Sequence, residues 1–494
     1  MINGRRLQIV VALFAAAILS LGAHAAPVLA TDRSVPTITA IAAASTHACA
    51  LTSGGGVKCW GYGRFGQLGT GTASTSLVPI DVEGLSSGVR AISAGSLNSC
   101  AITTGGGVKC WGYGKGGLLG TGTANTSLSP VDVLGLTSGV TAMAMGDAFA
   151  CALTTGGGVK CWGWIMAVPL LTSPSLIPVD VKGLASGVMA IAAGSDHACA
   201  LTTRGGVKCW GFNDFGQLGD GSTADASLIP VDVKGLASGV SAISTGFRHT
   251  CALTTQGGVK CWGYNRFGQL GDGSIVNSSV PVDVSGLGSG IRAISAGSSH
   301  SCAITNGGGA KCWGLNTLGQ LGHGRANSRT PVNVAGLASG TTAIVASNGY
   351  TCALTSRGAV KCWGSNYYGQ FGTGTRTNSR IPVDVDFATH QTIVLRASEP
   401  AGAIVPGTAV TFRATVSPLG SAGEPVKVRF EIYRQDNGVW RLAAVRDVAA
   451  DASGRASLRW TFVTTGARYV RAKAFANVTY AASAWSPRVL YTVG

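Results

Sequence analysis

The sequence is poor in charged residues and in proline. Only 12% of its 494 residues are charged, about half of the ~25% usual in globular proteins, which excludes a helical protein laced with surface ion pairs. The 16 prolines and 74 glycines follow no G-X-Y period, which excludes collagen. A hydrophobic share of 46% excludes a disordered chain. What remains is a glycine-punctuated, mostly β protein.

Apolar runs long enough to cross a membrane are missing downstream of the N-terminus, since a spanning helix needs about 20 such residues. At the N-terminus, Arg5 and Arg6 precede an apolar run over residues 7–21, and Ala23-His24-Ala25 follows. This order is typical of a secretory signal peptide. We expect residues 1–25 to be removed and the mature chain to be secreted, periplasmic or at the cell surface, without membrane insertion.

The cysteines mark seven internal repeats. Successive cysteine pairs lie about 50 residues apart, and nine residues separate the two members of each pair. Each unit holds four short runs bounded by glycine, V-x-A-I, C-A-L-T, V-K-C-W-G and P-V-D-V, which are typical of strands. Four strands in such a unit make one propeller blade. The sequence therefore predicts an all-β fold with a seven-bladed β-propeller over residues 35–387.

The repeat also resembles a known family. The fifth unit reads His249-Thr-Cys251-Ala-Leu-Thr, then Gly-Val-Lys-Cys-Trp-Gly over 258–263, then Gly-Gln-Leu-Gly over 268–271. This pattern is similar to the regulator of chromosome condensation repeat, in the cysteine-bearing form of exported bacterial proteins. The resemblance implies a seven-bladed propeller. Among the activities it implies are nucleotide exchange on a small nuclear GTPase and inhibition of β-lactamases by binding them.

Each cysteine pair flanks a glycine-rich turn and is predicted to lie in one hairpin. Directly opposed residues on one face lie about 4.5–5.5 Å apart, which suits a disulfide. Zinc is the rival interpretation, but structural zinc favours closer cysteine spacing. We expect no metal or cofactor. The predicted disulfides join Cys49 to Cys59, Cys100 to Cys110, Cys151 to Cys161, Cys199 to Cys209, Cys251 to Cys261, Cys302 to Cys312 and Cys352 to Cys362.

Two G-x-G-x-x-G matches, starting at Gly61 and Gly112, lack the following helix of a dinucleotide site. At the position of Gly63, four later units carry asparagine. We interpret this position as one with a left-handed backbone.

Three polar residue types recur at fixed positions and are predicted to serve the fold. Histidine stands two residues before the first cysteine in four units, and we expect it to hydrogen-bond backbone between blades. A lysine beside the second cysteine and an aspartate in the last strand are predicted to pair. In the sixth unit Asn333 replaces the aspartate, which leaves Lys311 without an acidic partner. No catalytic constellation stands apart from the repeats, so we expect no enzyme activity.

A binding site on a repeat scaffold should lie where the units differ. One position after each W-G varies freely and is predicted to be exposed, whereas the large apolar residue after it is predicted to pack. The third unit departs most, because Trp164 and an apolar loop to Leu171 replace G-Q-L-G. That loop either contacts a partner or folds inward. The predicted partner-binding residues are Arg64, Lys115, Trp164, Leu170, Asp214, Arg266 and Tyr367.

The cysteines and the period stop after Asp386. Following a linker at 388–391, residues 392–494 hold seven alternating runs separated by turn signals, which predict an immunoglobulin-like β-sandwich. The sequence around Tyr469 resembles a tyrosine corner, as in bacterial immunoglobulin-like domains.

Together these features predict an exported, non-catalytic protein that binds through its propeller loops. The net charge of +16 favours a protein or an anionic cell-surface polymer as partner, and we expect no nucleic acid and a monomer. Two alternatives remain open. One is a regulator resembling a guanine-nucleotide exchange factor, which rests on the resemblance alone. The other is an envelope polysaccharide-binding or adhesin module.

Overall fold

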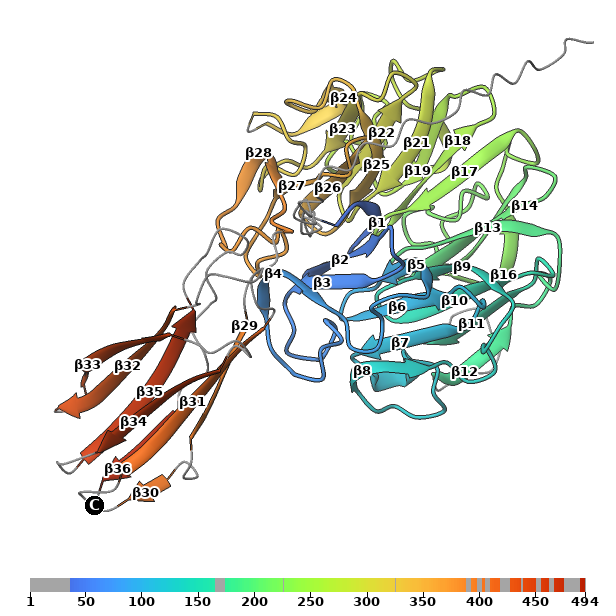
Figure 1. The fold of residues 1–494 in the computed structure, drawn as a ribbon. Helices are drawn as coiled ribbons and strands as arrows, with labels where there is room; N and C mark the ends of the chain where they lie inside the picture. The colour runs from blue at the N-terminus through green and yellow to red at the C-terminus, as the bar shows by residue number, and fades with distance from the viewer. Residues whose placement is uncertain are drawn as a thin grey trace, which may run out of the picture. The chain divides into compact units, whose positions relative to one another are not determined.

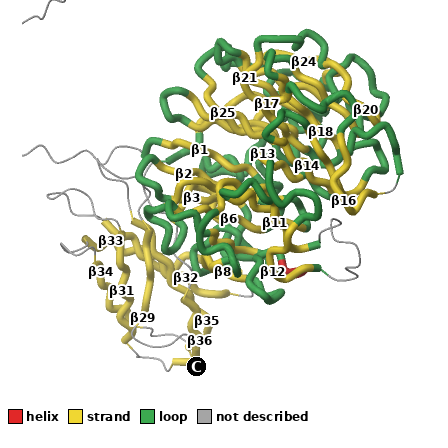
Figure 2. The backbone as a smooth tube through the Cα atoms, turned by 90° about the vertical axis from the view of Figure 1, so that its right-hand side faces the viewer, coloured by secondary structure: helices red, strands yellow, loops and turns green. Residues whose placement is uncertain are grey.

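The computed structural model describes residues 36–164, 174–224, 226–324 and 326–387, and eight strands beyond residue 391. The chain divides into a unit that spans Val35–Thr389 and a second that holds His390–Gly494. The described residues form strands and loops with one short 3-10 turn, at Lys115–Gly117, and no α-helix (Figure 2). No helix in these parts of the chain is long and apolar enough to cross a membrane.

The first unit is a seven-bladed β-propeller in which each blade is one antiparallel four-stranded sheet formed by one repeat (Figure 1). This confirms the predicted architecture. Blades 1 to 3 comprise β1 (Ile38–Ala43), β2 (His47–Thr52), β3 (Val57–Gly61), β4 (Ser76–Asp81); β5 (Val89–Ala94), β6 (Asn98–Thr103), β7 (Val108–Gly112), β8 (Ser127–Asp132); β9 (Val140–Met145), β10 (Phe149–Thr154), β11 (Val159–Gly163) and β12 (Ser175–Asp180).

Blades 4 to 7 repeat the same order of strands. They comprise β13 (Val188–Ala193), β14 (His197–Thr202), β15 (Val207–Phe212), β16 (Ala226–Asp232); β17 (Val240–Thr245), β18 (His249–Thr254), β19 (Val259–Gly263), β20 (Ser278–Asp283); β21 (Ile291–Ala296), β22 (His300–Thr305), β23 (Ala310–Gly314), β24 (Ser328–Asn333); β25 (Thr341–Ala346), β26 (Tyr350–Thr355), β27 (Val360–Gly364) and β28 (Ser379–Asp384).

The first strand of each blade lies next to the first strand of the following blade, so these strands surround the axis. The second strands are the C-A-L-T runs, and all but their last residues are buried, whereas the fourth strands are partly exposed. Each core cluster therefore fills the space between two neighbouring blades, as where Leu51 and Val82 of blade 1 pack with Trp111 of blade 2. The tryptophan of each W-G is fully buried in this way.

All seven predicted disulfides form within the hairpins of the second and third strands. The two cysteines of each pair are directly opposed in the register, as Cys49 is to Cys59. Their Cα atoms lie 4.0–4.1 Å apart, closer than predicted. Each disulfide closes a short loop, for which the chain-entropy model gives about 2–3 kcal/mol of stabilisation.

The recurring histidines hydrogen-bond a hydroxyl group of the next blade, and not backbone as predicted. His249 Nε2 lies 2.8 Å from Ser301 Oγ, and that hydroxyl donates to the Gln269 carbonyl at 2.9 Å. Since the hydroxyl has one proton, it must accept the Nε2 proton of the histidine. The Trp313 indole donates to the same carbonyl at 2.9 Å. We call this chain from histidine through hydroxyl to carbonyl the relay.

The relay joins four of the seven pairs of neighbouring blades. Burial of these four imidazoles lowers their pKa to about 3, or to about 4 for His197. The remaining three pairs have an alanine where the hydroxyl would stand, at Ala48, Ala150 and Ala198. The histidine–hydroxyl pairs are His47 with Ser99, His197 with Thr250, His249 with Ser301 and His300 with Thr351.

Contacts between blades 7 and 1 close the ring. The Tyr350 hydroxyl donates to the His47 carbonyl at 2.8 Å, and the Trp60 indole donates to the Gln370 carbonyl at 2.8 Å. The Phe387 ring packs edge-on against Trp60 with centroids 5.5 Å apart. The last propeller residues thus cover the core of the first blade.

The prediction of a left-handed backbone at Gly63 is wrong. Gly63 is absent from the positive-φ glycines, and the equivalent Gly114 has φ of −109°. A Cβ atom at Gly63 would collide with the Ser74 carbonyl, which explains glycine there. The equivalent Asn213 is buried and accepts a 2.9 Å hydrogen bond from the Leu218 amide. Glycine and asparagine are thus two ways of packing the same loop.

The predicted lysine–aspartate pairs form across the third and fourth strands of six blades, with N–O distances of 2.6–2.8 Å. In the sixth blade Lys311 donates instead to the Asn333 amide oxygen at 2.8 Å. Lys311 therefore keeps a hydrogen-bond partner, but that partner carries no negative charge.

The described strands of the second unit form a three-stranded sheet, β29-β31-β34, and a five-stranded sheet, β30-β36-β35-β32-β33. The short β30 pairs in parallel with the final strand, β36. Phe412 of one sheet and Phe430 of the other are buried. The strands are β29 (Thr392–Ala397), β30 (Gly402–Ile404), β31 (Ala409–Ser417), β32 (Lys427–Asp436), β33 (Val439–Ala449), β34 (Arg455–Thr461), β35 (Gly466–Ala474) and β36 (Val489–Val493).

Candidate binding face

Two sets of loops share one face of the propeller because the strands of each blade run antiparallel. The turns between first and second strands and the loops after W-G lie at the same strand ends, as the 3.0 Å hydrogen bond from the Tyr62 amide to the Thr46 carbonyl shows. We call this side the loop face. The hairpins that follow C-A-L-T, such as residues 53–56, lie on the opposite face.

The predicted variable positions are exposed on the loop face, and their role in binding stays a prediction. These residues are Arg64, Lys115, Asp214, Arg266 and Tyr367. The apolar neighbours Phe65, Phe215 and Phe267 are half-buried, as predicted for packing residues. Leu318 and Tyr368 are more exposed, by 38% and 43%, although the Tyr368 ring still packs on a neighbouring ring.

Aromatic side chains on the loop face form a continuous row across blades 7, 1 and 2. Tyr368 packs on Tyr62 with centroids 5.2 Å apart, and Tyr62 contacts Phe65 at 6.1 Å. Phe65 in turn contacts Tyr113 at 5.2 Å. All three contacts are edge-to-face, which suits the quadrupoles of the rings. We call these four residues the aromatic band.

Arg64 and Tyr367 stand beside the aromatic band and extend it towards solvent. The exposed fraction of Tyr367 is 70%. Because each of them precedes a band residue in the chain, their backbones are fixed by the same loops. The sequence indicated the positions, but it could not show that rings of three blades touch.

Trp164 lies on the loop face at the start of the divergent third loop, with an exposed fraction of 55%. Its indole covers Gly116 of blade 2, where a Cβ atom would collide with it. Behind it, between blades 3 and 4, lies an apolar cavity of about 220 Å³ lined by residues that include Phe149, Trp210 and Phe212. Leu170, the other predicted contact of this loop, lies outside the described residues.

A second aromatic group occupies blades 4 and 5. Phe215 and Tyr264 lie with centroids 4.9 Å apart, and Tyr264 contacts Phe267 at 6.2 Å. The Arg248 guanidinium stacks on Phe215 at 4.9 Å and on Phe247 at 5.2 Å. Cation–π contacts of this kind hold the arginine against the rings.

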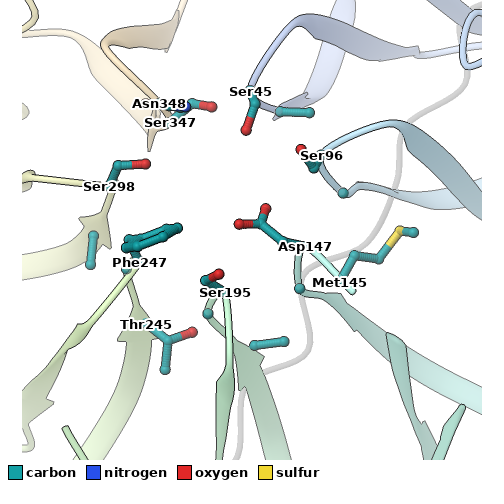
Figure 3. A pocket seen from close by; sticks show the side chains of 18 of the residues that line it. Ser45, Ser96, Met145, Asp147, Ser195, Thr245, Phe247, Ser298, Ser347 and Asn348 are labelled. Carbon is teal, nitrogen blue, oxygen red and sulfur yellow. The ribbon is translucent and has the colours of Figure 1, made fainter. Parts of the chain in front are cut away.

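The turns between first and second strands surround an opening on the axis, which sequence reasoning missed. Each blade contributes three consecutive residues to its lining, and the cavity measures about 110 Å³. Figure 3 shows their side chains from close by. We call the ring formed by the last residue of each three the axial cup. It comprises Ser45, Ser96, Asp147, Ser195, Phe247, Ser298 and Asn348.

The repeats, the seven blades and the loop face define a β-propeller of the RCC1 type. The family profile described as the RCC1-like domain matches residues 166–405. Two profiles of the regulator of chromosome condensation (RCC1) repeat match residues 55–102 and, for the second profile, 38–67, 89–117 and 140–164.

The sequence is also similar to known proteins of this class. Ultraviolet-B receptor UVR8 of Arabidopsis thaliana is 30% identical over 298 residues, which cover 58% of this chain and 68% of the receptor. E3 ubiquitin-protein ligase HERC2 of Homo sapiens is 32% identical over 292 residues, covering 58% of this chain but 5% of that protein. The chain therefore belongs to the regulator of chromosome condensation repeat family.

Solved structures show the same fold. The crystal structure of Kap60 bound to yeast RCC1 (Prp20) contains a chain that matches with a TM-score of 0.59 at 21% identity, covering 74% of this chain and 91% of that chain. Human WBSCR16 matches with a TM-score of 0.61 at 22% identity, covering 68% of this chain and 96% of the other.

Proposed function

We propose that this chain is an exported, non-catalytic protein that binds a protein partner on its loop face. The observation that carries the proposal is the aromatic band together with the exposed Arg64 and Tyr367 beside it. Tyrosine, tryptophan and arginine are the residues that most often dominate the energy of protein interfaces. Rings held by three edge-to-face contacts also lose little freedom on binding.

Trp164 extends this surface on blade 3. One side of its large exposed ring packs against Gly116. Exposed aromatic rings are enriched at protein interfaces. Relatives support a protein as the partner. The similar yeast Prp20p was described with its binding to Gsp1p and histones.

Export is supported by the disulfides. The described residues contain no free cysteine, and seven disulfides fit an oxidising compartment. The N-terminal residues 1–25, which carry the predicted signal peptide, lie outside the described residues.

The second unit is proposed to be an immunoglobulin-like sandwich. Its division into three- and five-stranded sheets, and the parallel pairing of β30 with β36, support this proposal. Among the described residues of this unit, none favours polymer binding over protein binding by the loop face. Nucleotide exchange is supported only by membership of the regulator of chromosome condensation repeat family.

The proposal can be tested by capturing partners from the surface of the source organism with immobilised full-length protein. The test variant is Arg64→Ala with Tyr367→Ser on the loop face. The matched control is Arg204→Ala with Arg357→Ser, two exposed arginines in hairpins of the opposite face. We expect one or more proteins to bind the wild type and the control but not the test variant. Loss with both variants, or with neither, would contradict the proposal.

A further inference from the structure

The axial cup departs from its own repeat at three positions. Four of its seven rim residues are serine, so serine is the residue that this turn ordinarily carries. Asp147 of blade 3, Phe247 of blade 5 and Asn348 of blade 7 stand at serine positions. Since residues that recur mostly serve the fold, the departures are the candidates for a separate role. Asn348 is polar and uncharged like serine, so Asp147 and Phe247 are the two side chains that change the chemistry of the rim.

The two unusual side chains point towards each other across the opening. Figure 3 shows the Asp147 carboxylate and the Phe247 ring directed to the middle of the axial cup from different sides, with hydroxyl groups around them. Backbone hydrogen bonds link successive turns, from the Phe247 amide to the Gly297 carbonyl and from the Ser298 amide to the Ser347 carbonyl, both at 3.2 Å. The rim on this side is therefore fixed by the blades.

The charge inside the axial cup is negative, although the whole chain is basic. No lysine or arginine is among the described residues that line it. The surrounding ring desolvates Asp147 and so raises its pKa. A hydrogen bond with Ser195 acts in the other direction, and the nearby Asp196 adds to the rise. Arg248 follows Phe247 in the chain, and its guanidinium stacks on the rings of Phe215 and Phe247.

We propose that the axial cup binds one small organic cation, an alkylammonium or guanidinium group. A carboxylate attracts such a group and accepts its hydrogen bonds, serine hydroxyls accept further ones, and the face of Phe247 attracts positive charge. The cavity of about 110 Å³ holds such a head group but not a folded element. A divalent metal is a poorer fit, because calcium and magnesium sites use more oxygen ligands and usually several carboxylates.

The proposal goes beyond the protein partner proposed above, because the cation can be free or can belong to a lysine or arginine side chain. Two probes distinguish these sources. One is n-butylammonium, and the other is lysine blocked as N-acetyl-lysine methylamide. The uncharged N-acetyl-norleucine methylamide is the matched control ligand. Binding to the full chain is measured by calorimetry and by ligand-observed NMR at low salt.

We expect both cationic probes to bind and the norleucine amide not to bind. Tighter binding of the lysine amide assigns the site to a protein side chain, and equal binding assigns it to the head group alone. Binding of the norleucine amide as tightly as the lysine amide would overturn the proposal, as would binding of calcium in place of both amines.

Variants of the rim test the site itself. Asp147→Ser and Phe247→Ser restore the residue that four other blades carry, so both variants should keep the fold. We expect Asp147→Ser to weaken probe binding by about tenfold or more, as loss of a charged hydrogen bond implies, and Phe247→Ser to weaken it by about threefold or more. Asp232→Asn removes an exposed carboxylate outside the axial cup and copies the Asn333 of blade 6, so it should change nothing. Equal losses in Asp147→Ser and Asp232→Asn would show general charge attraction and contradict the site.

Discussion

At the scale of the residue, the buried histidines explain why two positions in successive repeats vary together. A histidine in one unit always accompanies serine or threonine in the next, and any other residue there accompanies alanine. The disulfides could be predicted because both cysteines lie in one repeat. The relay could not be, because its partners lie in different repeats about 50 residues apart.

Lowered histidine pKa values make the stability of the propeller fall in acid. In the unfolded chain each histidine takes up a proton near pH 6.5, whereas the four buried ones stay neutral until about pH 3–4. Between these values the unfolded state binds more protons, so each histidine destabilises the fold by about 1.4 kcal/mol per pH unit as pH falls. Full stability is present only above about pH 6.5.

Guanidinium chloride unfolding from pH 7.5 to 5 measures this dependence. The variant His249→Phe copies the Phe149 of blade 3. We expect it to lower the slope of the unfolding free energy against pH by the contribution of one histidine, about 1.4 kcal/mol per pH unit. An unchanged slope would mean that His249 takes up its proton over the same pH range in the folded and the unfolded chain.

The relay itself predicts non-additive substitutions. His249→Phe alone leaves the Ser301 hydroxyl without its donor, and Ser301→Ala alone leaves the buried Nε2 proton without an acceptor. We expect each single change to destabilise the fold by about 1–3 kcal/mol, the cost of an unsatisfied buried polar group. The double variant, which has the Phe–Ala pair found at Phe149 and Ala198, should cost less than the sum. Additive values in unfolding experiments at pH 7.5 would refute the pairing.

At the scale of the element, blade 3 is the one blade that, among the described residues, takes part in no relay with either neighbour. Phe149 and Ala150 replace a histidine and a hydroxyl, and no Gly-Gln-Leu-Gly loop follows its W-G. Asn98 of blade 2 is buried with no hydrogen-bond partner for its amide atoms. The strands themselves were predictable from their apolar runs. In the second unit, β30 was missed because three residues are too few to show alternation.

Hydrogen exchange should show this weakness. We expect amides of β10 (Phe149–Thr154) to exchange about tenfold faster than those of β18 (His249–Thr254), because about one net hydrogen bond per interface is missing. Both strands carry a disulfide at the same position, so the comparison is matched. Equal protection of the two strands would show that the relay does not set local stability.

At the scale of the molecule, one repeat forms one blade, and the ring closes by side-chain contacts and by a 2.8 Å backbone hydrogen bond from the Gly374 amide of blade 7 to the Leu77 carbonyl of blade 1. Tyr350 reaches the His47 carbonyl across 303 residues of sequence, and the period of the repeats holds no sign of this contact. The same closure brings Tyr368 of blade 7 next to Tyr62 of blade 1 and so completes the aromatic band. The sequence predicted which positions vary on the loop face. It could not show that residues of blades 7, 1 and 2 form one surface, because blades 7 and 1 become neighbours only when the ring closes.

The central claim is that the loop face over blades 7, 1 and 2 binds a protein partner. Hydrogen exchange of the full chain, with and without a partner captured as described above, tests it most directly. We expect new protection in residues 62–68, 113–119 and 365–371, and none in the opposite hairpins at 53–56, 104–107 and 203–206. Protection confined to those hairpins or to residues 392–494 would contradict the claim.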